Sequence, residues 1–227
     1  TPADGFNFFN WTDAEGNVVS SENPYTYCGK DAIDLVAHFV PNKWGAPDED
    51  KADWADITSY KQYVSTISLK QNGQTTNLYE TTACPDQLFN LVPKQIEVAP
   101  GAEFSISWSD AGGLQYTYLS AYLDLNADGE FNMDDELLGV KGTLSAQNTA
   151  VKNGTFTILL PYDMPLGLTH IRLRFDGAWK SGYKTTEKGK AFPAKMTANR
   201  MVYDIPVNVV AVAPYATTVT VKSVDEL

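Results

Sequence analysis

The chain has 227 residues, of which 17 are basic and 28 acidic, so its formal net charge is −11 at pH 7. With 43% hydrophobic and 12% aromatic residues, the composition excludes a disordered or fibrous protein and leaves room for one large or two modest domains. The excess of acidic residues argues against a nucleic-acid partner, because nucleic-acid-binding proteins neutralise phosphates with lysine and arginine.

The N-terminal segment, residues 1–45, is predicted to be a small β-rich unit. An aromatic run from Gly5 to Trp11 leads into a turn at Gly16, and a second apolar run follows from Leu35 to Phe39. This order of an aromatic strand, a glycine turn and an Ala-x-Phe strand is similar to the β-grasp-like repeats of Listeria and Bacteroides surface proteins. The similarity covers part of such a repeat.

Residues 46–60 are predicted to form an acidic linker. The stretch from Pro47 to Asp56 is rich in acidic residues and shows no alternation of period two. A short helical turn from Asp48 to Trp54 is the alternative, because acidic side chains near a helix N-terminus are favoured by the helix dipole.

The two cysteines, Cys28 and Cys84, lie far apart in the sequence and form no Cys-x-x-Cys pair, so they do not suggest a zinc site. Two unpaired thiols and one disulfide are both compatible with this spacing. A disulfide would require an oxidising compartment.

Residues 61–214 are predicted to form an antiparallel all-β sandwich of the jelly-roll or immunoglobulin-like kind. Apolar and polar residues alternate in several runs, and turn signals such as Asn72-Gly73 leave no room for crossover helices between them. The clearest alternating runs span residues 104–108, 156–160, 171–175 and 205–209. Pro206 suggests an edge strand or a bulge, because proline cannot donate to a β-ladder. Residues 215–227 are a tail or a link to a further module.

The sharpest motif runs from Asp124 to Glu136 and holds six acidic side chains in thirteen residues. Oxygen-bearing side chains stand at alternate positions before Gly129, an arrangement that allows Ca²⁺ to collect six to eight oxygen ligands. The preceding run, residues 116–123, is aromatic and strand-like, which excludes an EF-hand helix pair. Phe131 is expected to anchor the loop in the core. The predicted ligands are Asp124, Asn126, Asp128, the carbonyl of Glu130, and a closing carboxylate from Asp135 or Glu136; an acidic loop that stays empty is the alternative.

The order of four segments resembles the GEVED domain, a β-sandwich module of secreted and surface proteins of bacteria, notably Bacteroidetes. These segments are the loop 124–136, the strand 155–160, Pro165-Leu166-Gly167 leading into 171–174, and the strand 202–209. The resemblance covers about residues 57–212 and implies a secreted or outer-surface location. The namesake Gly-Glu-Val-Glu-Asp motif is altered, because Arg200, Met201 and Tyr203 replace its glycine and two glutamates, and Asp204 alone matches among its charged positions.

No catalytic motif is present, and the two histidines, His38 and His170, fall in different predicted domains, so we expect no enzyme. His170 is expected to be a half-exposed sheet residue. From His170 to Arg200 the chain is net basic, which indicates a solvated loop face or a docking face for an acidic partner. A glycan-binding face in this stretch is the sharper alternative, with the residues Trp179, Tyr183, Arg172 and Arg174.

The sequence therefore predicts a non-catalytic extracellular module with a structural Ca²⁺ loop, acting as a scaffold or as an adhesion or interaction domain. The alternative function is carbohydrate recognition by the residues 170–200. The expected partner is a glycan or a surface protein. No stretch is apolar enough to span a bilayer, so we expect no membrane insertion, and a monomeric part of a larger protein. The first residues lack the basic and apolar stretches of a signal peptide, which places any export signal outside this sequence.

Overall fold

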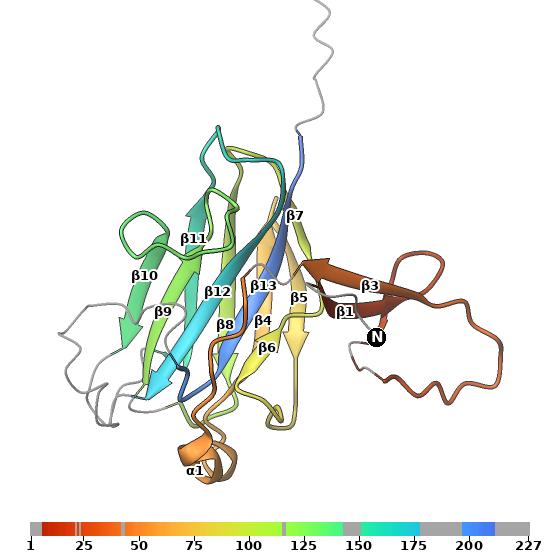
Figure 1. The fold of residues 1–227 in the computed structure, drawn as a ribbon, viewed down its shortest axis with the longest axis horizontal. Helices are drawn as coiled ribbons and strands as arrows, with labels where there is room; N and C mark the ends of the chain where they lie inside the picture. Colours follow the sequence, from red (N-terminus) through yellow and green to blue (C-terminus); the bar gives the residue numbers. More distant parts are fainter. Residues whose placement is uncertain are drawn as a thin grey trace, which may run out of the picture.

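A computed structural model describes residues 6–20, 22, 24–41, 44–114, 117–142, 151–177 and 197–211 of the chain. Nearly all the regular structure in these ranges is β-strand, and the predicted antiparallel all-β sandwich is confirmed (Figure 1). The only α-helix in the described ranges is α1 (Trp54–Ser59), so no helix there is long and apolar enough to cross a bilayer.

Two sheets form the sandwich (Figure 1). The first has four strands in the order β11 (Asn153–Leu159), β8 (Glu103–Asp110), β4 (Val64–Gln71) and β5 (Gln74–Glu80). The second runs β10 (Leu137–Gly142), β9 (Thr117–Leu123), β12 (Gly167–Gly177), β13 (Val202–Val209) and β6 (Phe89–Leu91), with β7 (Ile96–Val98) also paired to β13. All neighbours are antiparallel except β6 and β7, which pair with β13 in parallel.

Alternation along the four-stranded sheet places its apolar side chains in the core, as predicted. On β8, Phe104, Ile106 and Trp108 are buried, whereas the serines between them face outward and pair with threonines of β11. Ile106 stands opposite Phe156 in the antiparallel register. This pattern is typical of a strand that packs one face in the core and exposes the other face to solvent.

Strands β12 and β13 depart from the pattern because both of their faces are covered. One face packs in the central core with Leu173 and Tyr203, and the opposite face is covered by a smaller cluster that includes Trp44 and Phe131. His170 is therefore buried, not half-exposed as predicted. Strand β13 is an interior strand, so the predicted edge position of Pro206 is wrong; this proline stands between the residues that pair with β6 and those that pair with β7.

The segment 44–60 is hydrogen-bonded to the sandwich. The amide of Asp50 donates to the carbonyl of Ala198 at 2.7 Å, and the amide of Ala198 donates to the carbonyl of Asp48 at 2.7 Å. The Glu49 carboxylate accepts the amide of Phe89 at 2.8 Å. A 3₁₀ turn (Lys51–Asp53) and α1 follow, so helical structure begins three residues later than the Asp48 alternative and continues to Ser59.

The N-terminal segment forms a separate three-stranded sheet in the order β2 (Val18–Ser20), β1 (Phe6–Thr12) and β3 (Val36–Pro41) (Figure 1). The predicted strands 5–11 and 35–39 are thus present as β1 and β3, and their resemblance to a β-grasp-like repeat stays a prediction.

Cys28 and Cys84 are both free thiols.

The hydroxyl of Tyr203 joins the two sheets, because it accepts the amide of Val64 on β4 at 3.1 Å. Tyr203→Phe would leave this buried amide without its acceptor, and we expect a loss of about 1–3 kcal/mol in the free energy of unfolding. Urea denaturation followed by tryptophan fluorescence measures the change. Tyr162→Phe is the control, because Tyr162 is exposed and should leave stability unchanged; equal stability of the two variants would contradict the role of the bond.

Candidate functional site: the loop between β9 and β10 and its buried support

Residues 124–136 form the connection between β9 and β10, at the β10 end of the six-stranded sheet. Two residues of the loop have left-handed backbone conformations, Ala127 with φ 57° and Gly129 with φ 92°. Glycine adopts this conformation without steric cost, which explains its position in the motif. Phe131 is buried with Trp44 and Tyr122, so the predicted anchoring of the loop by Phe131 is confirmed.

Oxygen-bearing side chains at alternate positions of the loop accept backbone amides of the loop itself. Asp124 accepts the amide of Asp128 through Oδ1 at 3.3 Å and the amide of Gly129 through Oδ2 at 2.9 Å. Asn126 Oδ1 accepts the amide of Asp128 at 2.9 Å, and Asp128 Oδ1 accepts the amide of Glu130 at 2.7 Å. The alternation in the sequence thus gives one turn three side chains that accept its amides, of which only Asp124 is buried.

Glu136 closes the loop at its other end. Its Oε1 accepts the amide of Leu125 at 2.9 Å, and its Oε2 accepts the amide of Asn132 at 2.7 Å. The side chain is buried, in contrast to the exposed Asp135 and Glu130. Of the two residues predicted as the closing carboxylate, the structure therefore selects Glu136 as the one that faces the loop.

Asp124 is fully buried, and a tryptophan far away in the sequence supports it. Trp44 Nε1 donates to Asp124 Oδ2 at 2.6 Å, which gives this carboxylate three hydrogen bonds together with the two loop amides. The Thr169 hydroxyl donates to the backbone carbonyl of Asp124, whose amide donates to the carbonyl of His170 at 3.2 Å. The first residue of the loop is thus held by β12 and by the segment that follows β3.

A buried ion pair lies directly beneath Trp44. Arg172 donates to both oxygens of Asp204, from Nε at 2.7 Å and from Nη2 at 2.8 Å. The same Nη2 donates to the carbonyls of Trp44 at 3.1 Å and Gly45 at 2.8 Å. His170 stacks on the Trp44 ring at 3.9 Å between centroids, and its Nδ1 lies 3.5 Å from Asp204 Oδ2.

The pKa of Asp204 reflects this environment. Burial alone would raise it, but the charge and hydrogen bonds of Arg172, with a smaller contribution from His170, outweigh burial and lower the pKa below its usual value. Asp204 therefore has a defined structural role as the partner of Arg172, although the motif around it is altered.

The structure corrects the placement of Arg172 and Arg174, which the sequence suggested as ligand-binding residues. Both side chains are fully buried, and Arg174 is paired with Asp176 at 2.7 Å. Both guanidinium groups form internal ion pairs, so they cannot contribute to an exposed glycan-binding face. Trp179 and Tyr183, the aromatic residues of the same hypothesis, lie outside the described residues.

The chemistry of the loop suits a hard cation, but its arrangement is closed by its own hydrogen bonds. Carboxylate and amide oxygens are the donors that Ca²⁺ prefers, and each carboxylate oxygen that accepts one amide keeps a second lone pair. In the described ranges, however, no three His, Cys, Asp or Glu side chains lie close enough together to hold a metal ion. A bound Ca²⁺ would have to draw Asp124, Asp128 and Glu136 closer together.

Comparison with known families identifies the segment that contains this loop. Residues 118–200 match the family model of the GEVED domain. The GEVED match begins in β9 and includes the whole Asp124–Glu136 loop and β12, so the resemblance stated from the sequence is confirmed for this part of the chain. Comparison with curated proteins gave no match.

Trp44 is the residue that the sequence did not reveal as part of the site. It lies at the end of the predicted N-terminal unit 1–45, 80 positions before Asp124. A tryptophan in an otherwise polar stretch was the signal that could have indicated this role. Burial of a large aromatic side chain is favourable, and a buried indole N–H usually finds a hydrogen-bond acceptor.

The Arg172–Asp204 pair gives a stability prediction. Asp204→Asn leaves the buried guanidinium without its counter-charge, and we expect a loss of about 3–5 kcal/mol in the free energy of unfolding at pH 7. Urea denaturation measures it, and Asp163→Asn, at an exposed aspartate, is the matched control.

The same pair sets a pH dependence. The folded-state pKa of Asp204 is lowered, so its contribution is complete above its unfolded value, near 3.8, and is lost as the pH falls through the folded value. The stability difference between wild type and Asp204→Asn should therefore shrink when the pH falls below 3.8. A difference that is constant from pH 7 to pH 2 would contradict the assignment.

Proposed function

We propose that the chain is a non-catalytic extracellular module of a bacterial surface protein, in which the Asp124–Glu136 loop binds Ca²⁺ for structural support. The module acts as a scaffold or interaction domain within a larger assembly. Its β-sandwich and its GEVED segment support this proposal, together with the secreted or surface setting that the family resemblance implies.

One observation carries the Ca²⁺ proposal: Asp124, Asn126 and Asp128 all accept backbone amides of residues 128–130. These hydrogen bonds already organise the backbone of the turn that holds the three oxygen-bearing side chains. A cation then needs to move side chains rather than refold the loop, and its two positive charges would offset part of the repulsion among six acidic groups within thirteen residues.

The position of the loop explains what the cation would stabilise. The loop carries β10, the end strand of the six-stranded sheet as described, and through the Trp44–Asp124 bond it holds the segment 44–60. Ordering the loop would therefore fix both a sheet edge and the segment between the small N-terminal sheet and the sandwich.

The proposal of a non-catalytic module is supported by the buried carboxylates of the six-stranded sheet. Asp204 and Asp176 are each engaged by an arginine at 2.7 Å. A general acid or base must instead be within reach of a substrate and be able to exchange a proton during turnover.

Calcium titration tests the proposal. Extracellular sites bind Ca²⁺ with dissociation constants of about 10⁻⁴–10⁻³ M, so 10 mM free Ca²⁺ should add about 1.4–2.7 kcal/mol of stability. For a chain of this size we expect a rise of about 3–11 °C in melting temperature over EDTA-treated protein, measured by scanning calorimetry.

Two variants locate the effect. Asp124→Ala should abolish the calcium shift but also breaks the bond to Trp44. The second variant is therefore Asp128→Ala, at an exposed position that leaves the Trp44–Asp124 bond in place, and it should reduce the shift. Asp163→Ala lies outside the loop and should keep the full shift. Equal melting curves of the wild type in calcium and in EDTA would overturn the proposal.

A further inference from the structure

Two adjoining cavities lie where the N-terminal sheet meets the sandwich. The first, of about 570 Å³, is lined by residues of β1, β5 and β6, and the second, of about 670 Å³, by residues of β1, β4, β5 and β7. Phe9, Leu78 and Lys94 line both cavities, which are here together called the junction groove. Each cavity has the size of a small-molecule site.

Both walls of the junction groove contain a β-bulge. In β1 the register with β3 shifts between Phe8 and Asn10, and in β5 the register with β4 skips Leu78. The extra residues, Phe9 and Leu78, are buried and line both cavities. Bulges re-aim side chains and are frequent beside functional sites, so two bulges facing one groove indicate a shaped surface.

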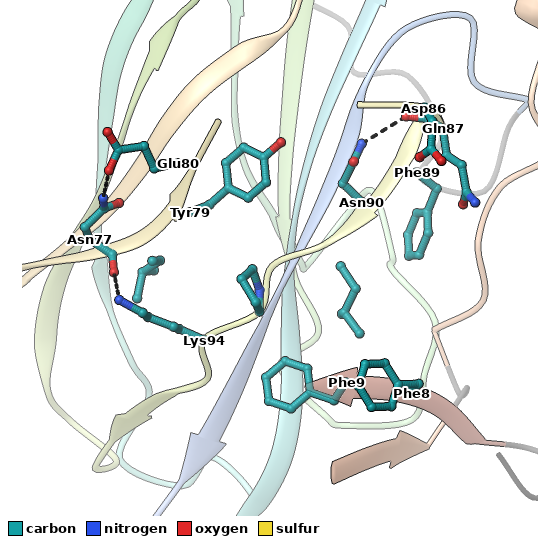
Figure 2. Close-up of a pocket in the computed structure, with 13 residues that line it drawn as sticks. Phe8, Phe9, Asn77, Tyr79, Glu80, Asp86, Gln87, Phe89, Asn90 and Lys94 are labelled. Atoms are coloured by element: carbon teal, nitrogen blue, oxygen red, sulfur yellow. Dashed lines mark hydrogen bonds between the residues drawn. The ribbon is translucent and has the colours of Figure 1, made fainter. Parts of the chain in front are cut away.

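Aromatic rings line the first cavity from three strands. Phe8 and Phe9 come from β1, Tyr79 from β5 and Phe89 from β6, and Figure 2 shows the two β1 rings at one end of the cavity. Phe89 is half-buried, with the Arg172 guanidinium 5.6 Å from its ring centroid. These rings are held by neighbouring packing and offer apolar surface to a ligand.

Amide and charged side chains line the two sides of the same cavity (Figure 2). On one side, Asn77 donates to Glu80 Oε2 at 2.8 Å, and Lys94 donates to the carbonyl of Asn77 at 2.8 Å. On the other side, Asn90 donates to the carbonyl of Gln87 at 3.3 Å. Side-chain amides supply both donors and acceptors, which is the pairing that hydroxyl groups require.

Asn10, a residue that lines the second cavity, has a buried side-chain oxygen without a partner in the described part of the chain. Asn10 is 4% exposed and donates from Nδ2 to the carbonyl of Pro93 at 2.7 Å, whereas its Oδ1 has no hydrogen-bond partner among the described residues. Leaving a buried acceptor unsatisfied costs about 1–3 kcal/mol.

From these features we infer that the junction groove binds a neutral oligosaccharide. Sugar rings present C–H faces to aromatic rings and hydroxyls to amides and carboxylates, and both kinds of surface are present here. An anionic ligand is disfavoured because three carboxylates, Glu80, Asp86 and Glu97, line the groove against one lysine, Lys94.

An added peptide strand fits less well than a sugar chain. The carbonyl of Asn77 on β5 is already bonded to Lys94, and the amide of Phe89 on β6 is bonded to Glu49. Strand addition depends on a row of available backbone groups along a sheet edge, and these bonds interrupt it.

Calorimetric titration of the full chain with cellohexaose, xylohexaose, mannohexaose and maltohexaose tests the inference, with hexagalacturonate as the anionic comparison. At least one neutral hexaose should bind, and more tightly than hexagalacturonate. Gln87→Ala and Phe8→Ala should each weaken that binding by about 2–12-fold, the equivalent of 0.5–1.5 kcal/mol for one lost contact. Binding should persist in EDTA, which separates this site from the calcium loop.

The matched controls are Gln74→Ala, an exposed glutamine on β5 outside the groove, and Tyr162→Ala, an exposed aromatic residue on the sandwich. Both should bind like the wild type, and circular dichroism confirms folding of every variant. Three results would overturn the inference: no binding of any neutral hexaose at millimolar concentration, stronger binding of hexagalacturonate, or binding unchanged in both Gln87→Ala and Phe8→Ala.

Discussion

The segments that cover the outer face of β12 depend on the buried guanidinium of Arg172. It donates to both oxygens of Asp204 and to the carbonyls of Trp44 and Gly45. The ring of Phe131 lies over the same group at 4.7 Å. A charge without water must be surrounded by partners of this kind, because an unpaired buried charge is strongly destabilising. The strand β12 thus requires a covering layer, and residues 44–60 and the 124–136 loop supply it.

This requirement connects features that are distant in the sequence. Trp44 contributes its carbonyl to Arg172 and its indole N–H to Asp124, so one residue joins the ion pair to the first residue of the acidic loop. Phe89 contacts the same guanidinium and also lines the junction groove. The loop and the groove therefore share one buried support, although their ligand chemistry differs and their proposed ligands do not compete.

The sequence predicted the features that depend on local pattern. Alternation in β8 and β11 identified the sandwich, and Phe131 anchors the acidic loop as predicted. The calcium ligands expected between Asp124 and Glu136 stay a prediction. The same kind of alternation gave a wrong prediction for β12. There Arg172 and Arg174 alternate with apolar residues, which normally indicates a solvent-exposed face. Burial of these arginines depends on Asp204, Asp176 and Trp44, which only the tertiary fold brings near. The junction groove could not be predicted from the sequence either, because it depends on bulges in β1 and β5 whose register no local pattern specifies.

The position of β13 has a consequence for how the chain reaches its fold. This strand lies between β12 and the pair β6 and β7, and its parallel partners precede it by more than a hundred residues. Closing such long loops is entropically expensive, and folds dominated by non-local strand pairing form slowly. Until residues 202–209 have been synthesised, the larger sheet therefore lacks an interior strand, and β6 and β7 lack the strand with which they pair. The larger sheet can thus be completed only after β13 has been synthesised.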